Sequence, residues 1–172
     1  MELWDLYDIQ RLKLGKTHER GKPLDKGEYH LVVHVCIFNS KGQMLIQQRQ
    51  PFKEGWPNLW DITIGGSVVR GETSQMGAHR ELLEEIGYDY NFEGVRPHIT
   101  LNFVRGFDDV YLIQQDLDPA ALTLQYEEVQ RVKWATREEI QQMIIEKTFI
   151  HYHPPLIDLF FELRHTYNSI VE

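Results

Sequence analysis

The segment between Gly65 and Gly87 constrains the fold of this chain most strongly, because it joins a glycine pair, a polar loop and an amphipathic helix. Apolar side chains recur every four residues within it, at Ala78, Leu82 and Ile86. This spacing places them on one face of a helix, with charged residues on the other faces. The pattern predicts a helix over Ser74–Ile86 that packs its apolar stripe against a core.

Three glutamates accompany this predicted helix. Glu81 precedes Glu84 by three residues and Glu85 by four, so their carboxylates lie on neighbouring turns. They repel one another unless a cation lies among them, and Mg²⁺ prefers such hard oxygen ligands. Taken alone, however, an R-E-x-x-E-E string is more often a solvated surface, with Arg80 pairing with Glu84 across one turn.

The residues around the glutamates decide between these two interpretations. The segment Gly66–Tyr88 resembles the Nudix box, G-x5-E-x7-R-E-U-x-E-E-x-G-U, where U is a bulky aliphatic residue. The matching positions are Gly66, Glu72, Arg80, Glu81, Leu82, Glu84, Glu85 and Gly87. The single departure is Tyr88, whose bulky ring can still pack inward.

The resemblance implies a Mg²⁺-dependent hydrolase that cleaves a diphosphate linkage in a nucleoside di- or triphosphate or a related nucleotide derivative. Mn²⁺ is an alternative metal. Glu81, Glu84 and Glu85 take the places of the metal-binding and catalytic glutamates, and Arg80 that of the arginine that holds a box glutamate by an ion pair. Metal binding would neutralise the phosphate oxygens and activate a water, whose proton a carboxylate accepts. The general base varies within the family and stays open.

Three further box positions have supporting roles in the same resemblance. Glu72 contacts the network of the first helical turn, or the metal through water. Gly66 and Gly87 allow the loops at the two ends of the box to pack closely.

A second string, Arg49–Trp60, resembles the branch of isopentenyl diphosphate isomerase and its hydrolase relatives. There a similar Arg and Lys bind the diphosphate, which makes Arg49 and Lys53 the candidate substrate-binding residues; the alternative is that they are surface charges at a strand end. The isomerases use a Cys just after this string, but Asp61–Gly66 contains neither Cys nor His. They also have a degraded box, so hydrolysis is favoured. An isomerase-like enzyme and a non-catalytic nucleotide-binding domain remain the alternatives.

Three other residues are weaker candidates. His30 falls where the isomerases place a metal-binding His, although a lone His on an apolar strand is more often structural. Asp109, in a turn predicted at 106–109, resembles an isomerase acid and could complete a metal site or act as base, or simply cap backbone amides. Glu127 and Glu128 lie where some Nudix hydrolases carry a late catalytic Glu, but such charges more often face solvent.

The order of predicted elements indicates an α+β fold, an α/β/α sandwich with a mixed central sheet and flanking helices. The predicted strands are Leu3–Asp8, Leu12–Thr17, His30–Asn39, Gln43–Gln48, Trp60–Ile64, Ile99–Val104, Val110–Gln115 and Val129–Trp134. The other predicted helices are Arg137–Glu146 and Leu156–Tyr167. We expect one domain over residues 1–172, with residues 1–29 forming a short strand extension packed on it.

Composition limits the partners of such a domain. The formal net charge of −8 and the absence of a basic stripe argue against a nucleic-acid polymer and favour a small-molecule diphosphate substrate. No stretch approaches the roughly 20 apolar residues that span a bilayer. The single Cys36 lies in an apolar run and cannot form an internal disulfide, which favours the cytoplasm. Many Nudix proteins dimerise, and the segment before His30 could mediate a homodimer.

Overall fold

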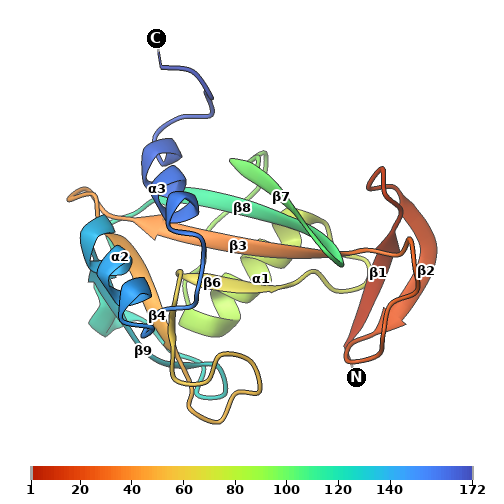
Figure 1. Ribbon diagram of the computed structural model, residues 1–172, viewed down its shortest axis with the longest axis horizontal. Coiled ribbons are helices and arrows are strands. Elements are labelled where there is room, and N and C mark those ends of the chain that lie inside the picture. Colours follow the sequence, from red (N-terminus) through yellow and green to blue (C-terminus); the bar gives the residue numbers. More distant parts are fainter. Residues whose placement is uncertain (1, 172) are drawn as a thin grey trace.

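A computed structural model describes residues 2–171, and its centre is a seven-stranded mixed sheet between layers of helices (Figure 1). The strands of this sheet are β3 (His30–Phe38), β4 (Met44–Arg49), β5 (Trp60–Asp61), β6 (Ile64–Ser67), β7 (Ile99–Phe103), β8 (Gly106–Gln114) and β9 (Val129–Ala135). Five of them run in the order β5-β4-β3-β8-β7, while β6 pairs with β3 and β9 with β4. β3 and β8 are parallel and the other pairs antiparallel. The predicted α+β sandwich is confirmed.

Helix α1 (Ser74–Ile86) covers one face of the sheet and has the bounds that the apolar spacing predicts. Its start is capped by Thr73, whose hydroxyl accepts from the Met76 N–H at 3.3 Å. Its end is Gly87, with a left-handed φ of 68° that most other residues adopt only at a cost. The apolar stripe of α1 is fully buried in the core on this face.

Helices α2 (Arg137–Ile145) and α3 (Pro154–Leu163) cover the opposite face. Thr136 and Glu139 form a capping box at the start of α2. α3 begins two residues earlier and ends four residues before the predicted helix. The early start has a clear cause, because proline fits the first turn of a helix, where its missing N–H is not needed.

The strands β3 and β4 pair only beside their connecting turn, at Phe38 and Met44, and then diverge. Between them lies Thr63, whose hydroxyl accepts from the Ile37 N–H at 2.9 Å and donates to the Leu45 carbonyl. The prediction of one strand over Trp60–Ile64 was therefore wrong. Trp60 and Asp61 pair with β4, whereas Ile64 begins a second strand on β3.

The turn predicted at 106–109 was also wrong, because β8 already begins at Gly106. Phe103 pairs with Gly106, so the turn lies at residues 104 and 105. Asp108 and Asp109 are consecutive strand residues and point to opposite faces of the sheet. The turn-like composition of this stretch hid its strand character.

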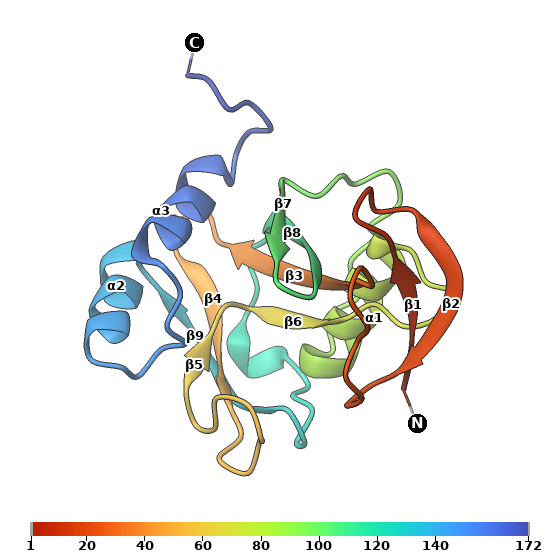
Figure 2. The ribbon, with the colours of Figure 1, turned by 45° about the vertical axis from the view of Figure 1, so that its right-hand side comes forward.

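The N-terminal residues form a separate two-stranded sheet, β1 (Leu3–Tyr7) and β2 (Lys13–Glu19), as predicted for the extension. This hairpin stands beside the α1 end of the main sheet (Figure 2). Arg11, in its turn, donates to the buried Asp109 carboxylate of β8, with one N···O distance of 2.9 Å. Within residues 2–171, no helix has the length and apolar character needed to cross a membrane.

Candidate active site

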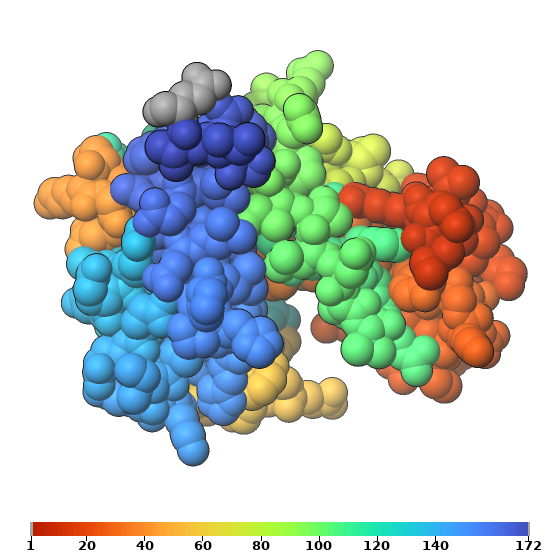
Figure 3. Space-filling view, turned by 45° about the horizontal axis from the view of Figure 1, so that its top comes forward, coloured from red at the N-terminus to blue at the C-terminus, as the bar shows by residue number. Residues whose placement is uncertain are grey.

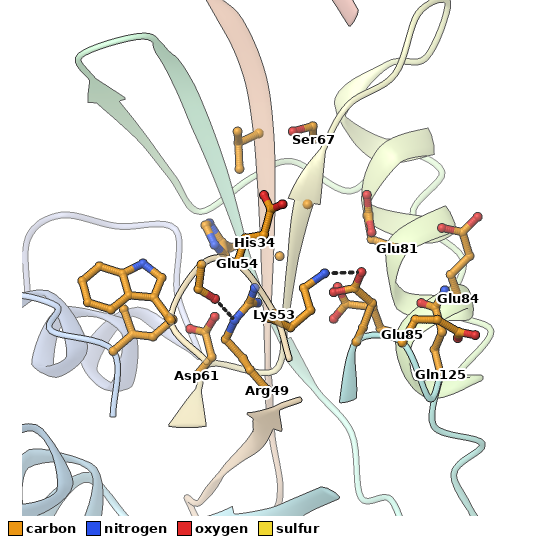
Figure 4. A pocket seen from close by; sticks show the side chains of 18 of the residues that line it. His34, Arg49, Lys53, Glu54, Asp61, Ser67, Glu81, Glu84, Glu85 and Gln125 are labelled. Atoms are coloured by element: carbon orange, nitrogen blue, oxygen red, sulfur yellow. Dashed lines mark hydrogen bonds and ion pairs between the residues drawn. The ribbon is translucent and has the colours of Figure 1, made fainter. Parts of the chain in front are cut away.

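A large cleft with a volume of about 1260 Å³ opens where β3 and β4 diverge. Figure 3 shows that the surface is hollowed here. The β7–β8 turn and the N-terminal hairpin lie on one side of the hollow, and the loops around residues 52 and 151 lie on the other. Its wall on one side is α1, and its other walls come from β3, β5, β6 and the loops around residues 53, 127 and 151. Figure 4 shows the α1 glutamates on one side, His34 and Asp61 on the other, and Arg49 and Lys53 between them.

Glu85 is a buried carboxylate without a cation partner. Only 4% of its surface is exposed, and its one side-chain hydrogen bond comes from the Gln47 amide at 2.8 Å. No Lys, Arg or His within residues 2–171 forms an ion pair with it. Burial raises the pKa of Glu85 well above its ordinary value, and repulsion from Glu81 raises this pKa further. A buried carboxylate in this situation is a ready ligand for a cation.

Arg80 holds the neighbouring glutamates in place. Its guanidinium donates to Glu72 at 2.7 and 3.1 Å, to Glu81 at 2.9 Å and to Glu84 at 3.1 Å. It also donates to the Ser67 carbonyl of β6 at 2.9 Å, which ties the helix to the sheet. The ion pair that the resemblance implied for Arg80 is thus present in the structure, and Glu72 belongs to the same network.

Gly66 provides the space that the Glu81 carboxylate occupies. A Cβ at position 66 would lie between 2.1 and 2.6 Å from the carboxylate atoms of Glu81, far inside van der Waals contact. Gly87 has a different reason, since its φ is left-handed and a Cβ there would meet Thr123 at 2.9 Å. Both glycines have backbone and packing roles, in agreement with the prediction.

The glutamates of α1 fit a magnesium ion by their chemistry. Within the described residues 2–171, no group of three or more Asp, Glu, His or Cys side chains is arranged to hold a metal ion. Mg²⁺ does not require one, because it is usually held by one or two carboxylates and keeps positions for water and substrate phosphates. Glu85 and Glu81 both present carboxylate oxygens in the cleft, and within residues 2–171 Glu85 has no cationic partner.

Arg49 and Lys53, the predicted substrate-binding residues, both line the cleft. Arg49 donates only to the Gly55 carbonyl, at 3.0 Å, so its charge is not neutralised by an ion pair within residues 2–171. Lys53 donates to Glu128 at 2.6 Å across the cleft. Glu128 therefore lies in the cleft and not simply in solvent, and its neighbour Glu127 lines the cleft too.

The wall opposite α1 carries polar residues that the sequence did not single out. His34 of β3 binds Asp108 of β8 through Nδ1, at 2.8 Å from both carboxylate oxygens. Beside this pair, the buried Asp61 accepts a hydrogen bond from the Tyr152 hydroxyl at 2.8 Å. Burial raises the pKa of Asp61. The signal in the sequence that could have identified His34 is a polar residue inside an otherwise apolar strand, because such residues are rarely buried without a role.

Two weaker candidates lie outside the cleft. The ring of His30 stacks on Trp4, with centroids 4.2 Å apart, and meets the edge of Phe103. Asp109 is 1% exposed, on the α1 side of the sheet, where it accepts from Arg11 and from Thr100. Neither residue lines the cleft. The neighbouring acid of β8, Asp108, points to the other face of the sheet and contacts His34.

The cleft is lined by more acidic side chains than arginines and lysines. Its carboxylates are Glu2, Glu54, Asp61, Glu81, Glu84, Glu85, Glu127 and Glu128, and its arginines and lysines are Arg20, Arg49, Lys53 and Arg80. Of these cations, Arg20 pairs with Glu2, Lys53 with Glu128 and Arg80 with the box glutamates. An anionic substrate therefore needs further positive charge, which a divalent metal can supply.

The comparisons with known proteins agree with this architecture. A family model described as NUDIX domain matches residues 28–159. A Nudix hydrolase of Listeria monocytogenes is 49% identical over 152 residues, covering 88% of this chain and 90% of its own. Nudix hydrolase 3 of Arabidopsis thaliana is 36% identical over 83% of this chain, which matches 20% of that longer protein.

More distant relatives include an isopentenyl-diphosphate Delta-isomerase of Pectobacterium atrosepticum, 44% identical over 92 residues, which covers 54% of this chain and 49% of its own. Among solved structures, that of DR0079 from Deinococcus radiodurans has a TM-score of 0.74 at 24% identity, covering 94% of this chain and 98% of its own. This likeness supports the fold. The family match and the Listeria relative together show that the chain belongs to the Nudix hydrolase family.

Proposed function

We propose that this protein is a Mg²⁺-dependent hydrolase that cleaves a diphosphate linkage in a nucleoside di- or triphosphate or a related small nucleotide derivative. The observation that carries the proposal is the unpaired, buried Glu85 beside Glu81 in a cleft that also holds Arg49 and Lys53. One side of the cleft is suited to a divalent cation and the middle to an anionic substrate. Mn²⁺ suits the same oxygen ligands.

In this proposal the residues of α1 form the metal site. Glu81, Glu84 and Glu85 would provide the carboxylate ligands of the metal, which when bound would neutralise phosphate oxygens and lower the pKa of a water. Arg80 keeps Glu81 and Glu84 oriented through its hydrogen bonds.

The substrate-binding task falls to Arg49 and Lys53. They bind the phosphates, and Lys53 exchanges its pairing with Glu128 for the substrate. Once released, Glu128 is an acidic group in the cleft that can accept a proton from water, as can the half-exposed Glu84.

Two observations favour hydrolysis over isomerisation of an isoprenoid diphosphate. The stretch after Trp60 has no Cys, and the residues at its end that line the cleft are Gly65 and Gly66. Cys36 is completely buried in the core beneath α2 and α3. Burial raises the pKa of the Cys36 thiol well above its ordinary value. It is not one of the residues that line the cleft.

The decisive experiment offers a panel of nucleoside phosphates, nucleotide sugars, dinucleotides and isopentenyl diphosphate with Mg²⁺, with EDTA as the metal-free arm. Product analysis by ³¹P NMR should show cleavage of a diphosphate bond only with metal, and Glu85→Gln should slow this cleavage by about 10³-fold. Migration of the double bond in isopentenyl diphosphate would support the isomerase alternative. Metal-dependent ligand binding without any product would support a nucleotide-binding domain.

A further inference from the structure

His34 lines the cleft and is held by Asp108, which is not itself a lining residue; this pair is separate from the glutamates of α1. Asp108 lies beside Val32 in the parallel β3–β8 register, so its carboxylate reaches the His34 ring two residues along the neighbouring strand. Both carboxylate oxygens lie 2.8 Å from Nδ1, which fixes the plane of the ring. Neither residue belongs to the proposed metal site or to the proposed phosphate-binding pair of Arg49 and Lys53.

The other ring nitrogen of His34 is available to a ligand. Within residues 2–171, Nε2 has no hydrogen-bond partner, and His34 lines the cleft. Because Asp108 occupies Nδ1, any hydrogen bond to a ligand must come from Nε2. An imidazole that lines a cleft, with one nitrogen held by a carboxylate and the other without a partner in the described chain, has the geometry of a binding group.

Gly65 shows that the fold reserves space for this ring. A Cβ at position 65 would lie 2.2 Å from Cδ2 and 2.4 Å from Nε2 of His34. The adjacent Gly66 reserves space in the same way for the Glu81 carboxylate. Consecutive residues of a strand face opposite sides of the sheet. Gly66 therefore makes room for Glu81 on one side of β6, and Gly65 makes room for the His34 ring on the other.

The charges around His34 favour a hydrogen-bond donor at Nε2. Burial lowers the pKa of His34, but the carboxylates of Asp108 and Asp61 more than offset this effect and the pKa is raised. Arg49 is the cation on this side, close enough to lower the pKa of Asp61. Figure 4 shows Arg49 between the His34 wall and the glutamates. Arg49 and His34 both line the cleft, and each acts on the carboxylate of Asp61.

We propose that His34, held by Asp108, donates a hydrogen bond from Nε2 to a phosphate oxygen of the bound diphosphate, on the wall opposite α1. This inference rests on the proposed function and extends it, because it makes His34 a third phosphate-binding group beside Arg49 and Lys53. The glutamates of α1, with a metal bound to them, would then contact the diphosphate from one side of the cleft, and the His34 imidazole would contact it from the other.

The test measures binding of methylenediphosphonate, which cannot be hydrolysed, by calorimetry in the presence of Mg²⁺. His34→Ala should weaken binding by about 10- to 100-fold, the range for a hydrogen bond to a charged group, and Asp108→Asn by less. His79→Gln is the matched control, since His79 also pairs with an aspartate, Asp89 at 2.9 Å, but lies outside the cleft. Its binding should stay within about twofold of the parent.

A purely structural role for His34 is excluded by a second readout. The ¹⁵N shift of His34 Nε2 should move when the probe binds to the parent protein, and the thermal midpoint of Asp108→Asn should show a folded chain. Unchanged binding in folded His34→Ala, or no binding of the probe by a parent that hydrolyses nucleotides, would overturn this inference alone. Binding by the parent, weakened in His34→Ala and without turnover of any substrate, would instead overturn the proposed function and leave the inference standing.

Discussion

The two walls of the cleft are built in different ways. The α1 wall comes from one contiguous segment, Gly66 to Gly87, in which the ligands, their orienting arginine and the glycine that makes room for Glu81 are close in sequence. The opposite wall is assembled from β3, β5, β8 and the loop before α3, so that Asp108 is 74 residues from His34, and Tyr152 is 91 residues from Asp61. A local wall can be recognised by spacing, whereas a composite wall exists only after folding.

The largest effect is expected on the α1 wall, from Glu85→Gln. Losing this carboxylate should lower kcat by about 10³-fold, the scale of a lost catalytic group. The metal-free variant should nevertheless unfold about 2–6 °C higher, because a neutral amide avoids burial of a charge beside Glu81. Phosphate release and thermal unfolding with and without Mg²⁺ measure both effects. Glu138→Gln, at an exposed site on α2, is the control, and equal activity of the two variants would refute the metal assignment.

The middle of the cleft should show a different kinetic signature. Lys53→Met and Arg49→Met remove charge-assisted hydrogen bonds to phosphate, so KM should rise by about 10- to 100-fold. Steady-state kinetics should give a smaller change in kcat for both variants. Lys26→Met, at an exposed position outside the cleft, provides the comparison. If KM stays constant while kcat falls, these residues do not bind the substrate ground state.

The glycine pair of β6 separates the two walls most directly. Gly66→Ala should displace the Glu81 carboxylate and lower kcat, whereas Gly65→Ala should displace the His34 ring and raise KM, each by about 10-fold. The two substitutions add the same methyl group at neighbouring positions, so each controls for the other. Identical kinetic changes would mean that the walls do not act separately.

The smallest effect concerns His30, which belongs to neither wall. Burial lowers the pKa of His30 to about 4. As the pH falls, the unfolded chain therefore protonates His30 at a higher pH than the folded protein does. The stability that depends on neutral His30 is lost as the pH falls from about 6.5 to about 4. We expect His30→Phe to reduce this pH-dependent loss by about 1–2 kcal/mol, after allowing for partial exposure of the ring. Urea unfolding at pH 7 and pH 4.5 measures this difference, with His79→Phe, at a partly exposed site, as the control. Parallel curves for His30→Phe and the parent would contradict the assignment.

The errors of sequence reasoning have a common physical origin. The stretch Phe107–Asp109 has the composition of a turn, but pairing of β8 with β3 and β7 makes it a strand. Asp109 then faces Arg11 of the N-terminal hairpin, a contact over 98 residues that no local pattern encodes. His34 was passed over because its chain neighbours are apolar, and only β8 provides its partner.

Local physics determined the part of the protein around Glu81, Glu84 and Glu85. All the determinants of this part act within Gly66–Gly87. Helix periodicity, a capping threonine and a left-handed glycine determined the helix, and the carboxylates on adjacent turns determined its candidate metal ligands. Tertiary structure decided the opposite wall. The divergence of β3 from β4, the Lys53–Glu128 pair and the space over Gly65 for His34 depend on contacts between distant segments. Such contacts form only when the whole core is buried, and for this reason they cannot be derived from residue spacing.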